Sequence, residues 1–157
     1  RETEDLYTII DSIIVCKFSR GTYYKGYEDL AALYSAVTGI AMTADELELA
    51  GERINNLGRL INTREGLTRK DDSLPWKVMN VPIPDEGPSK GAFVSQEDLD
   101  LLLDDYYEVR GWNKEGMPTM EKLSELGMED LAYIVKDKLA PKKPKRRTKT
   151  KEPKEEK

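Results

Sequence analysis

The residues best suited to chemistry in this chain are Asp11 and Cys16, which lie in the segment Asp-Ser-Ile-Ile-Val-Cys. Cys16 is the only cysteine, and the sequence contains no histidine. A thiolate can bind a metal ion, so this segment is the only candidate for redox chemistry in the sequence. One thiolate without histidine completes no metal site, so metal chemistry here needs ligands from another segment. A buried structural Cys16 and an exposed helical Asp11 are the alternative interpretations.

A second polar cluster contains Arg64, Arg69, Asp71 and Asp72. We interpret it as an ion-pair and capping network that attaches the following segment to a long helix. A catalytic carboxylate pair is the alternative, but adjacent aspartates are poorly spaced for separate acid and base roles, and no nucleophile accompanies them. The tryptophans and tyrosines lie beside proline and glycine turns, which favours packing over a ligand-stacking platform. The sequence has no phosphate-binding loop, dinucleotide fingerprint, zinc spacing or calcium loop.

The longest helix, around which the elements that carry these residues are organised, is predicted to run from Thr43 to Gly66. Thr43 and Glu46 form a capping-box pair at its start, and the glycine ends it. It carries the longest apolar stripe in the chain, so the other helices are expected to pack against it. Gly51 and Gly58 each cost about 1 kcal/mol relative to alanine, which predicts close approach of a neighbouring helix. The predicted stripe consists of Leu47, Ala50, Ile54, Leu57 and Ile61.

The helix that carries Asp11 is predicted to begin at Thr3, whose side chain can cap it. A second helix is predicted from Glu28 to Thr38, where Gly39 ends it. The first helix should be almost fully buried, and the second should bury one side. The predicted inward residues are Leu6, Ile9, Ile10, Ile13 and Ile14 in the first helix, and Leu30, Leu33, Tyr34 and Val37 in the second.

Towards the C-terminus, Ser95 and Thr119 are the predicted N-caps of two further helices, and Gly111 is the predicted end of the first of these. A last short helix follows Gly127. Residues 76–94 contain too many prolines and glycines for regular structure, which predicts an extended strap over the surface. The apolar stripe of the helix after Ser95 consists of Leu99, Leu102, Leu103, Tyr106 and Tyr107.

These elements predict an all-α, multihelical fold without internal repeats. The last residues are too poor in apolar side chains to offset the entropy of ordering, so we expect a disordered basic tail. The predicted divisions are a helical subdomain with the Asp11/Cys16 segment and the long helix (1–66), an irregular Pro/Gly-rich strap (67–94), a second helical segment (95–139) and the Lys/Pro-rich tail (140–157).

Charge is distributed unevenly. The tail after Ala140 carries nine Lys or Arg against three Glu, a net charge of +6, and the rest of the chain has a net charge of −11. The acidic body disfavours nucleic acid as a partner. The sequence has no long apolar run and no signal-peptide pattern, so we expect no membrane contact and a cytoplasmic location. Because the chain begins with Arg1 instead of Met, we interpret it as a piece of a longer polypeptide.

Three stretches carry a resemblance to a known family. They are Arg-Glu-Gly-Leu-Thr-Arg-Lys-Asp-Asp-Ser-Leu-Pro from Arg64, Pro-Ile-Pro-Asp-Glu-Gly-Pro-Ser-Lys-Gly from Pro82, and Tyr-Tyr-Glu-Val-Arg-Gly-Trp from Tyr106. In this order they resemble the C-terminal part of the tungsten-pterin aldehyde:ferredoxin oxidoreductases. The resemblance extends from Asp5 to Val135, which is most of the chain.

The segment from Asp11 to Cys16 is similar to the Asp-x-x-Gly-Leu-Cys motif of that family, with Ile14 in place of glycine and Val15 in place of leucine. The resemblance implies that Asp11 contacts the pterin of a tungsten (or molybdenum) bis-pterin cofactor. It also places Val15 in the cofactor-binding motif and makes Cys16 the fourth ligand of a [4Fe-4S] cluster. The β-branched Ile14 is expected to forbid the positive φ angle that a glycine permits.

The resemblance implies an enzyme that oxidises small aldehydes to carboxylic acids and passes the electrons through the cluster to ferredoxin. N-terminal domains of the same polypeptide would supply the other cluster ligands and the catalytic residues, so this chain alone is expected to be inactive. A homodimer is compatible with the resemblance. The oligomeric state, the metal and the particular aldehyde stay open. The alternative is a non-catalytic helical interaction module with an acidic surface and a basic tail.

Overall fold

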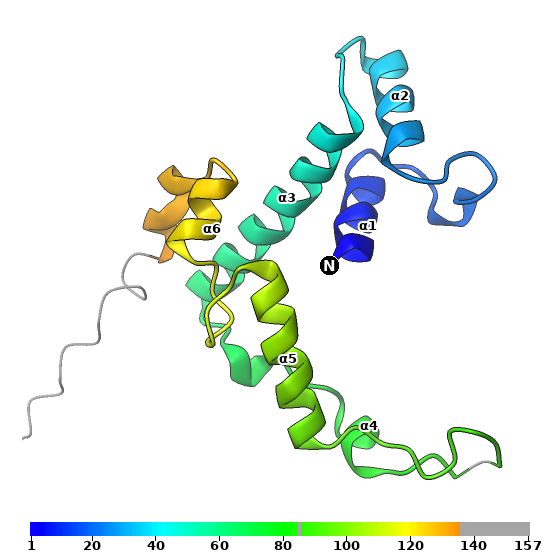
Figure 1. Cartoon of the computed structure of the whole chain (residues 1–157), viewed down its shortest axis with the longest axis vertical. Coiled ribbons are helices and arrows are strands. Elements are labelled where there is room, and N and C mark those ends of the chain that lie inside the picture. Colours follow the sequence, from blue (N-terminus) through cyan, green and yellow to red (C-terminus); the bar gives the residue numbers. More distant parts are fainter. Residues whose placement is uncertain (85, 136–157) are drawn as a thin grey trace, which may run out of the picture.

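A computed structural model describes residues 1–84 and 86–135 of the chain (Figure 1). The described residues form helices joined by loops, with only isolated β-bridges between them, so the all-α prediction is confirmed. None of the helices in this part of the chain is long and apolar enough to cross a membrane. The elements are α1 (Glu2–Ser12), η1 (Lys17–Ser19), α2 (Tyr27–Thr38), α3 (Ala44–Glu65), η2 (Arg69–Asp71), α4 (Trp76–Asn80), α5 (Gln96–Arg110), α6 (Met120–Glu125) and η3 (Glu129–Val135).

Helix α3 is the central element, and both of its predicted ends are confirmed. Thr43 and Glu46 form the reciprocal capping box, and Gly66 ends the helix in the left-handed conformation. The predicted apolar stripe is only partly right, because Ile54 and Ile61 are exposed. The buried face includes polar side chains that neighbouring elements satisfy, and it consists of Leu47, Gly51, Glu52, Asn56, Arg59, Leu60 and Thr63.

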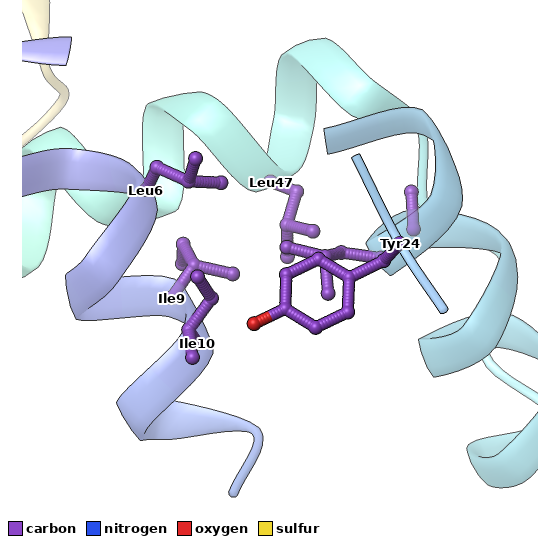
Figure 2. Packing of buried hydrophobic residues seen from close by; sticks show 7 residues of the cluster. Leu6, Ile9, Ile10, Tyr24 and Leu47 are labelled. Carbon is purple, nitrogen blue, oxygen red and sulfur yellow. The ribbon is translucent and has the colours of Figure 1, made fainter. Parts of the chain in front are cut away.

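The N-terminal core lies where α1, α2 and α3 meet (Figure 2). Gly51 permits the close contact between α1 and α3, since a Cβ atom there would lie 2.7 Å from the backbone oxygen of Asp5. This confirms the predicted close approach at Gly51. The same prediction is wrong for Gly58, where a Cβ atom would meet no atom within 4 Å. The core consists of Leu6, Ile9, Ile10, Tyr24, Leu30, Ala31 and Leu47.

The first two helices differ from their predicted limits. Helix α1 begins at Glu2 with Arg1 as its N-cap residue, so the predicted cap by Thr3 is wrong. It ends at Ser12, which leaves Ile14 exposed instead of buried. In α2, which Gly39 ends as predicted, Leu33 and Val37 face outwards and not into the core. The buried faces of both helices are therefore narrower than their apolar patterns.

A smaller C-terminal core joins α3, α6 and η3 through Leu60, Leu123, Leu126 and Met128. The predicted N-caps Ser95 and Thr119 are confirmed, because each side chain accepts a hydrogen bond from the third residue of its helix. Gly111 ends α5 as predicted. The predicted stripe of α5 is wrong at Leu102, which is exposed, and right at Leu99 and Tyr107, which are buried.

The proline-rich segment is less irregular than predicted. It contains α4, and its chain then reverses through hydrogen bonds between Ile83 and both Ala92 and Gly91. In Figure 1 the segment extends beyond one end of α5, so it projects from the helical body and does not wrap it. The tail 140–157, predicted to be disordered, lies outside the described residues.

Candidate functional site

The Asp11/Cys16 segment forms a capped helix end. The N–H of Val15 donates to the carbonyl of Ile10 at 3.0 Å, and the N–H of Ile14 donates to the carbonyl of Asp11 at 3.3 Å. This pair of bonds is a Schellman motif, whose left-handed position is usually a glycine. Ile14 occupies that position with φ of 61°. The expectation that isoleucine forbids a positive φ is therefore wrong. Ile14 is 92% exposed, so its side chain lies in solvent and outside the core.

Beyond the turn, a buried tyrosine fixes the backbone of Cys16. The hydroxyl of Tyr24 donates to the carbonyl of Cys16 at 3.0 Å. Figure 2 shows the ring of Tyr24 inside the N-terminal core with its hydroxyl directed towards α1. Val15 packs its side chain against the same core. The main chain at Cys16 is thus held from the protein side, and the cysteine itself is exposed.

Asp11 is an exposed carboxylate, which agrees with the alternative interpretation of this residue. Its Oδ2 atom lies 3.0 Å from the ammonium of Lys17, which also lies 5.2 Å from the centre of the Tyr7 ring. An ion pair at such an exposed position contributes little to stability. The carboxylate can therefore exchange this partner for another donor at small cost.

Asp11 and Cys16 fit the pterin cofactor and the [4Fe-4S] cluster that the family resemblance implies, but only as part of a larger site. No group of three or more His, Cys, Asp or Glu that could hold a metal ion lies within residues 1–84 and 86–135. Cys16 offers one accessible thiolate, which suits a cluster whose other ligands come from elsewhere. Asp11 can accept hydrogen bonds from a pterin ring. Because the side chain of Val15 faces the core, only its backbone is placed to contact a cofactor.

The second polar cluster holds the segment after α3 against that helix. Arg59 makes two hydrogen bonds to Asp72, at 2.8 and 2.5 Å, and Tyr107 donates to the same carboxylate. Burial acts to raise the pKa of Asp72, but the hydrogen bonds from Arg59 and Tyr107 outweigh it and lower the pKa below its usual value. Burial and the same carboxylate raise the pKa of Tyr107 to about 12. The side chains of Arg59, Asp72 and Tyr107 thus form one hydrogen-bonded network.

The structure contains an ion-pair and capping network of the predicted kind. The residues that pair with one another differ from those predicted. Arg69 donates to Asp104 of α5, so it ties η2 to that helix. Asp71 caps η2 through Thr68, and Arg64 pairs with the neighbouring Glu65. Sequence reasoning missed Arg59 as the partner of Asp72. No local pattern identifies this partner, because Arg59 lies outside the predicted apolar stripe and 13 positions from Asp72.

A fully buried ion pair connects α5 with α1. Arg110 is 0% exposed, and its Nη1 atom lies 2.7 Å from Oδ1 of Asp5. Arg110 also donates to Glu4, and Asn55 of α3 donates to Asp5 at 2.7 Å. No local pattern predicts this pair, because an acidic first turn and a basic last turn are ordinary features of exposed helices. Its role is to hold three helices together.

A groove of about 530 Å³ lies between α3 and α5, beside these two networks. Gly58 lines this groove, and a Cβ atom there would meet no other atom within 4 Å. The absence of a side chain at position 58 therefore leaves the groove wider and does not serve close helix packing. The carboxylates of Glu4 and Asp72, which line the groove, already accept hydrogen bonds from arginines. Thr8, whose hydroxyl also lines the groove, donates to Asn55, and both carboxylates are already paired, so the groove has no arrangement suited to acid–base or covalent catalysis. The helix end with Asp11 and Cys16 is the better candidate site.

Comparison with known families shows a match to the family model described as aldehyde ferredoxin oxidoreductase, domains 2 and 3, over residues 1–128. The chain is 39% identical over 128 residues to a tungsten-containing aldehyde ferredoxin oxidoreductase of Pyrococcus furiosus, and 36% identical to one of Thermococcus kodakarensis. It is 32% identical over 132 residues to the WOR-like subunit of an aliphatic sulfonate oxidoreductase of Pyrococcus furiosus.

Each of these matches involves about 80% of this chain, and the chain spans only 20% of the length of each of these relatives. Among solved structures, the active site complex BamBC of benzoyl coenzyme A reductase, bound to 1,5-dienoyl-CoA, is similar with a TM-score of 0.67 and 27% sequence identity. That similarity covers 87% of this chain and 20% of the other. The match therefore extends to the fold as well as the sequence.

Proposed function

The chain belongs to the aldehyde ferredoxin oxidoreductase family, and we propose that it is part of a tungsten enzyme that oxidises aldehydes to carboxylic acids. The family match over residues 1–128 is the observation that carries this proposal. In this reaction an aldehyde and water give a carboxylic acid, two protons and two electrons, and one-electron carriers such as ferredoxin accept the electrons one at a time. The exposed helix end with Asp11 and Cys16 is the part of the chain that would face the redox groups.

Cys16 would provide one of the four thiolates of a [4Fe-4S] cluster. Support comes from its accessible position and from a backbone that Tyr24 holds in place. Asp11 would accept hydrogen bonds from the pterin, exchanging its pairing with Lys17 for that contact. When bound, the tungsten-pterin group supplies the oxygen-transfer and electron chemistry, and this chain contributes binding and orientation.

An aldehyde is the substrate class that the relatives favour. The proteins that are 36–39% identical to this chain are named for aldehydes and ferredoxin, and the one that is 32% identical is named for aliphatic sulfonates. Because the chain spans a fifth of these relatives, the remaining cluster ligands and the catalytic groups would come from other domains. Those domains are the first partners that we propose, followed by ferredoxin.

The test uses the intact enzyme that contains this chain, purified without oxygen. Tungsten and iron contents are measured first, and then the reduction of ferredoxin with an aldehyde, an aliphatic sulfonate or no substrate. Bound tungsten with aldehyde-dependent reduction is the expected result. An enzyme without tungsten, or one that reduces ferredoxin only with the sulfonate, would overturn the proposed activity.

Asp11→Asn tests the proposed pterin contact with a readout other than activity. The variant should retain less tungsten than the unchanged enzyme, because an amide accepts hydrogen bonds more weakly than a carboxylate. Asp45→Asn, the same change at an exposed position in the first turn of α3, is the matched control and should retain tungsten fully. Equal tungsten retention in both variants would refute the role of Asp11.

A further inference from the structure

A second groove, of about 500 Å³, lies on the proline-rich segment that projects from the helical body (Figure 1). It is formed by the end of α4 and by the returning chain, and the residues that line it all belong to 77–94. We name it the α4 groove. Phe93 is 53% exposed, Val78 43% and Ile83 42%, and none of them belongs to either of the two cores. Such a contiguous exposed apolar surface marks a contact site.

Backbone hydrogen bonds hold the α4 groove in its shape. The N–H of Val94 donates to the carbonyl of Val78 at 3.2 Å, and the N–H of Ile83 donates to the carbonyl of Ala92 at 3.0 Å. The prolines on either side of Ile83 fix their own φ angles, which stiffens this part of the groove. A surface that is already ordered loses little conformational entropy when a partner covers it.

The α4 groove is apolar, and the segment that forms it has no net charge. Residues 76–94 contain Lys77 and Lys90 against Asp85 and Glu86, although the body as a whole is acidic. Lys77 is the one charged residue among those that line the groove. Permanent interfaces are depleted of charged residues in this way, whereas transient electron-transfer contacts are small and depend on steering by charge. The groove therefore suits a permanent contact and not an encounter with ferredoxin.

We propose that the α4 groove receives an apolar segment from another domain of the same polypeptide, and so attaches this chain to the rest of the enzyme. This inference rests on the proposed function, in which those domains complete the enzyme. The chain spans 20% of the length of its relatives, so about four-fifths of a polypeptide of that length lies outside it. A projecting apolar groove that contributes to neither core of its own chain is suited to contact with those domains.

A second copy of this chain fits the groove less well. Two copies that met here about a twofold axis would each bring the same surface to the contact. Val94 directly precedes the N-cap residue of α5, and the first turn of that helix carries Glu97 and Asp98. The contact would bring these carboxylates of both copies near one another, and like charges across an interface are unfavourable.

Site-specific photo-crosslinking in the intact enzyme identifies the occupant. p-Benzoyl-L-phenylalanine replaces Phe93 in one preparation and Tyr133 in a control preparation. Tyr133 is also an exposed aromatic residue, but it lies on η3 and beyond the residues that match the family. After irradiation, a denaturing gel shows whether the product has the mass of one polypeptide or of two. Mass spectrometry of the digest then identifies the crosslinked peptides.

The expected product keeps the mass of one polypeptide and joins position 93 to an apolar segment outside this chain, and position 133 gives no such product. A product with the mass of two copies, or of the enzyme with ferredoxin, would overturn the proposal. Crosslinks only within this chain, or none at all, would also overturn it.

The variant Phe93→Ser adds a second readout. Loss of a ring that another domain covers should lower the Tm of the intact enzyme by about 2 °C or more relative to Tyr133→Ser. Equal Tm values in the two variants would contradict the proposal. The proposed function fails separately, if the intact enzyme holds no tungsten, whatever product forms at position 93.

Discussion

Replacing Ile14 with glycine is expected to stabilise this chain, although it removes a large apolar side chain. Ile14 occupies the left-handed position of the Schellman motif with φ of 61°. An L-amino acid in that conformation costs about 1–2 kcal/mol. Because the side chain is almost fully exposed, its removal forfeits little buried surface.

The opposing contribution comes from the unfolded state, where glycine is more flexible than isoleucine. That flexibility lowers stability by about 0.4–1 kcal/mol. The difference leaves the Ile14→Gly variant more stable by about 0.5–1 kcal/mol, which corresponds to roughly 1–4 °C in Tm for a chain of this size. Ile14→Ala keeps the Cβ atom in the same conformation and should gain less.

Thermal and urea unfolding, followed by circular dichroism, measure this effect. Gly39→Ala is the matched control, because Gly39 ends α2 with φ of 75° and a Cβ atom there would meet no other atom within 4 Å. That change should destabilise by about 0.5–1 kcal/mol, because the left-handed conformation costs alanine more than its smaller flexibility in the unfolded state gains. If Ile14→Gly lowers the Tm, or if Gly39→Ala raises it, the reasoning from left-handed strain is refuted.

Three further predictions concern the polar contacts of the core. Tyr24→Phe should lose about 1 kcal/mol of stability with its hydrogen bond, whereas Tyr27→Phe should be neutral or stabilising, because that hydroxyl is buried without a partner among the described residues; equal losses in urea unfolding would contradict this. Arg110→Met should cost about 3 kcal/mol, because buried Asp5 loses its closest charge partner and keeps only Arg1 at 3.5 Å and the amide of Asn55, and adding Asp5→Leu should recover part of that loss; a double variant no better than the single one would argue against the pair. The folded pKa of Asp72 lies below its unfolded value of about 3.9, so its stabilisation is present above about pH 4 and is lost as the pH falls through the folded pKa. Asp72→Asn should therefore flatten the acid limb of a plot of unfolding free energy against pH, and an unchanged limb would refute that role.

The helix ends were the features most predictable from the sequence. Thr43 with Glu46, Ser95, Gly39, Gly66 and Gly111 all act as predicted, because capping depends on residues close together in the chain. The buried faces were less predictable, since tertiary contacts decide them. Ile54 and Ile61 match the apolar periodicity of the long helix but are exposed, whereas Glu52 and Arg59 are buried.

Burial of those polar residues depends on partners that are remote in sequence. Lys122 lies 3.2 Å from Glu52, and Asp72 pairs with Arg59. Periodicity treats such side chains as solvated, and no local pattern identifies their partners. The same limit applies to the ion pair of Asp5, whose partner lies more than one hundred positions away.

For the candidate site, the residues were easier to predict than their three-dimensional arrangement. The motif from Asp11 to Cys16 was visible in the sequence, but its geometry was not. Isoleucine at the glycine position suggested a disturbed turn, and the structure instead forms the full Schellman motif around Ile14. The exposure of the thiol also required the structure, because free cysteines are usually buried.

The most direct test of the account is the iron content and the electron paramagnetic resonance spectrum of the intact enzyme, compared with those of its Cys16→Ser variant. Both are purified without oxygen, and Ser12→Ala, at the exposed C-terminal end of α1 before the turn to Cys16, is the control. The expected result is a [4Fe-4S] signal that the control keeps and that Cys16→Ser loses or alters, together with part of the iron. An unchanged signal and full iron content in Cys16→Ser would show that Cys16 is not a ligand, and would favour the interpretation of this chain as a non-catalytic helical interaction module.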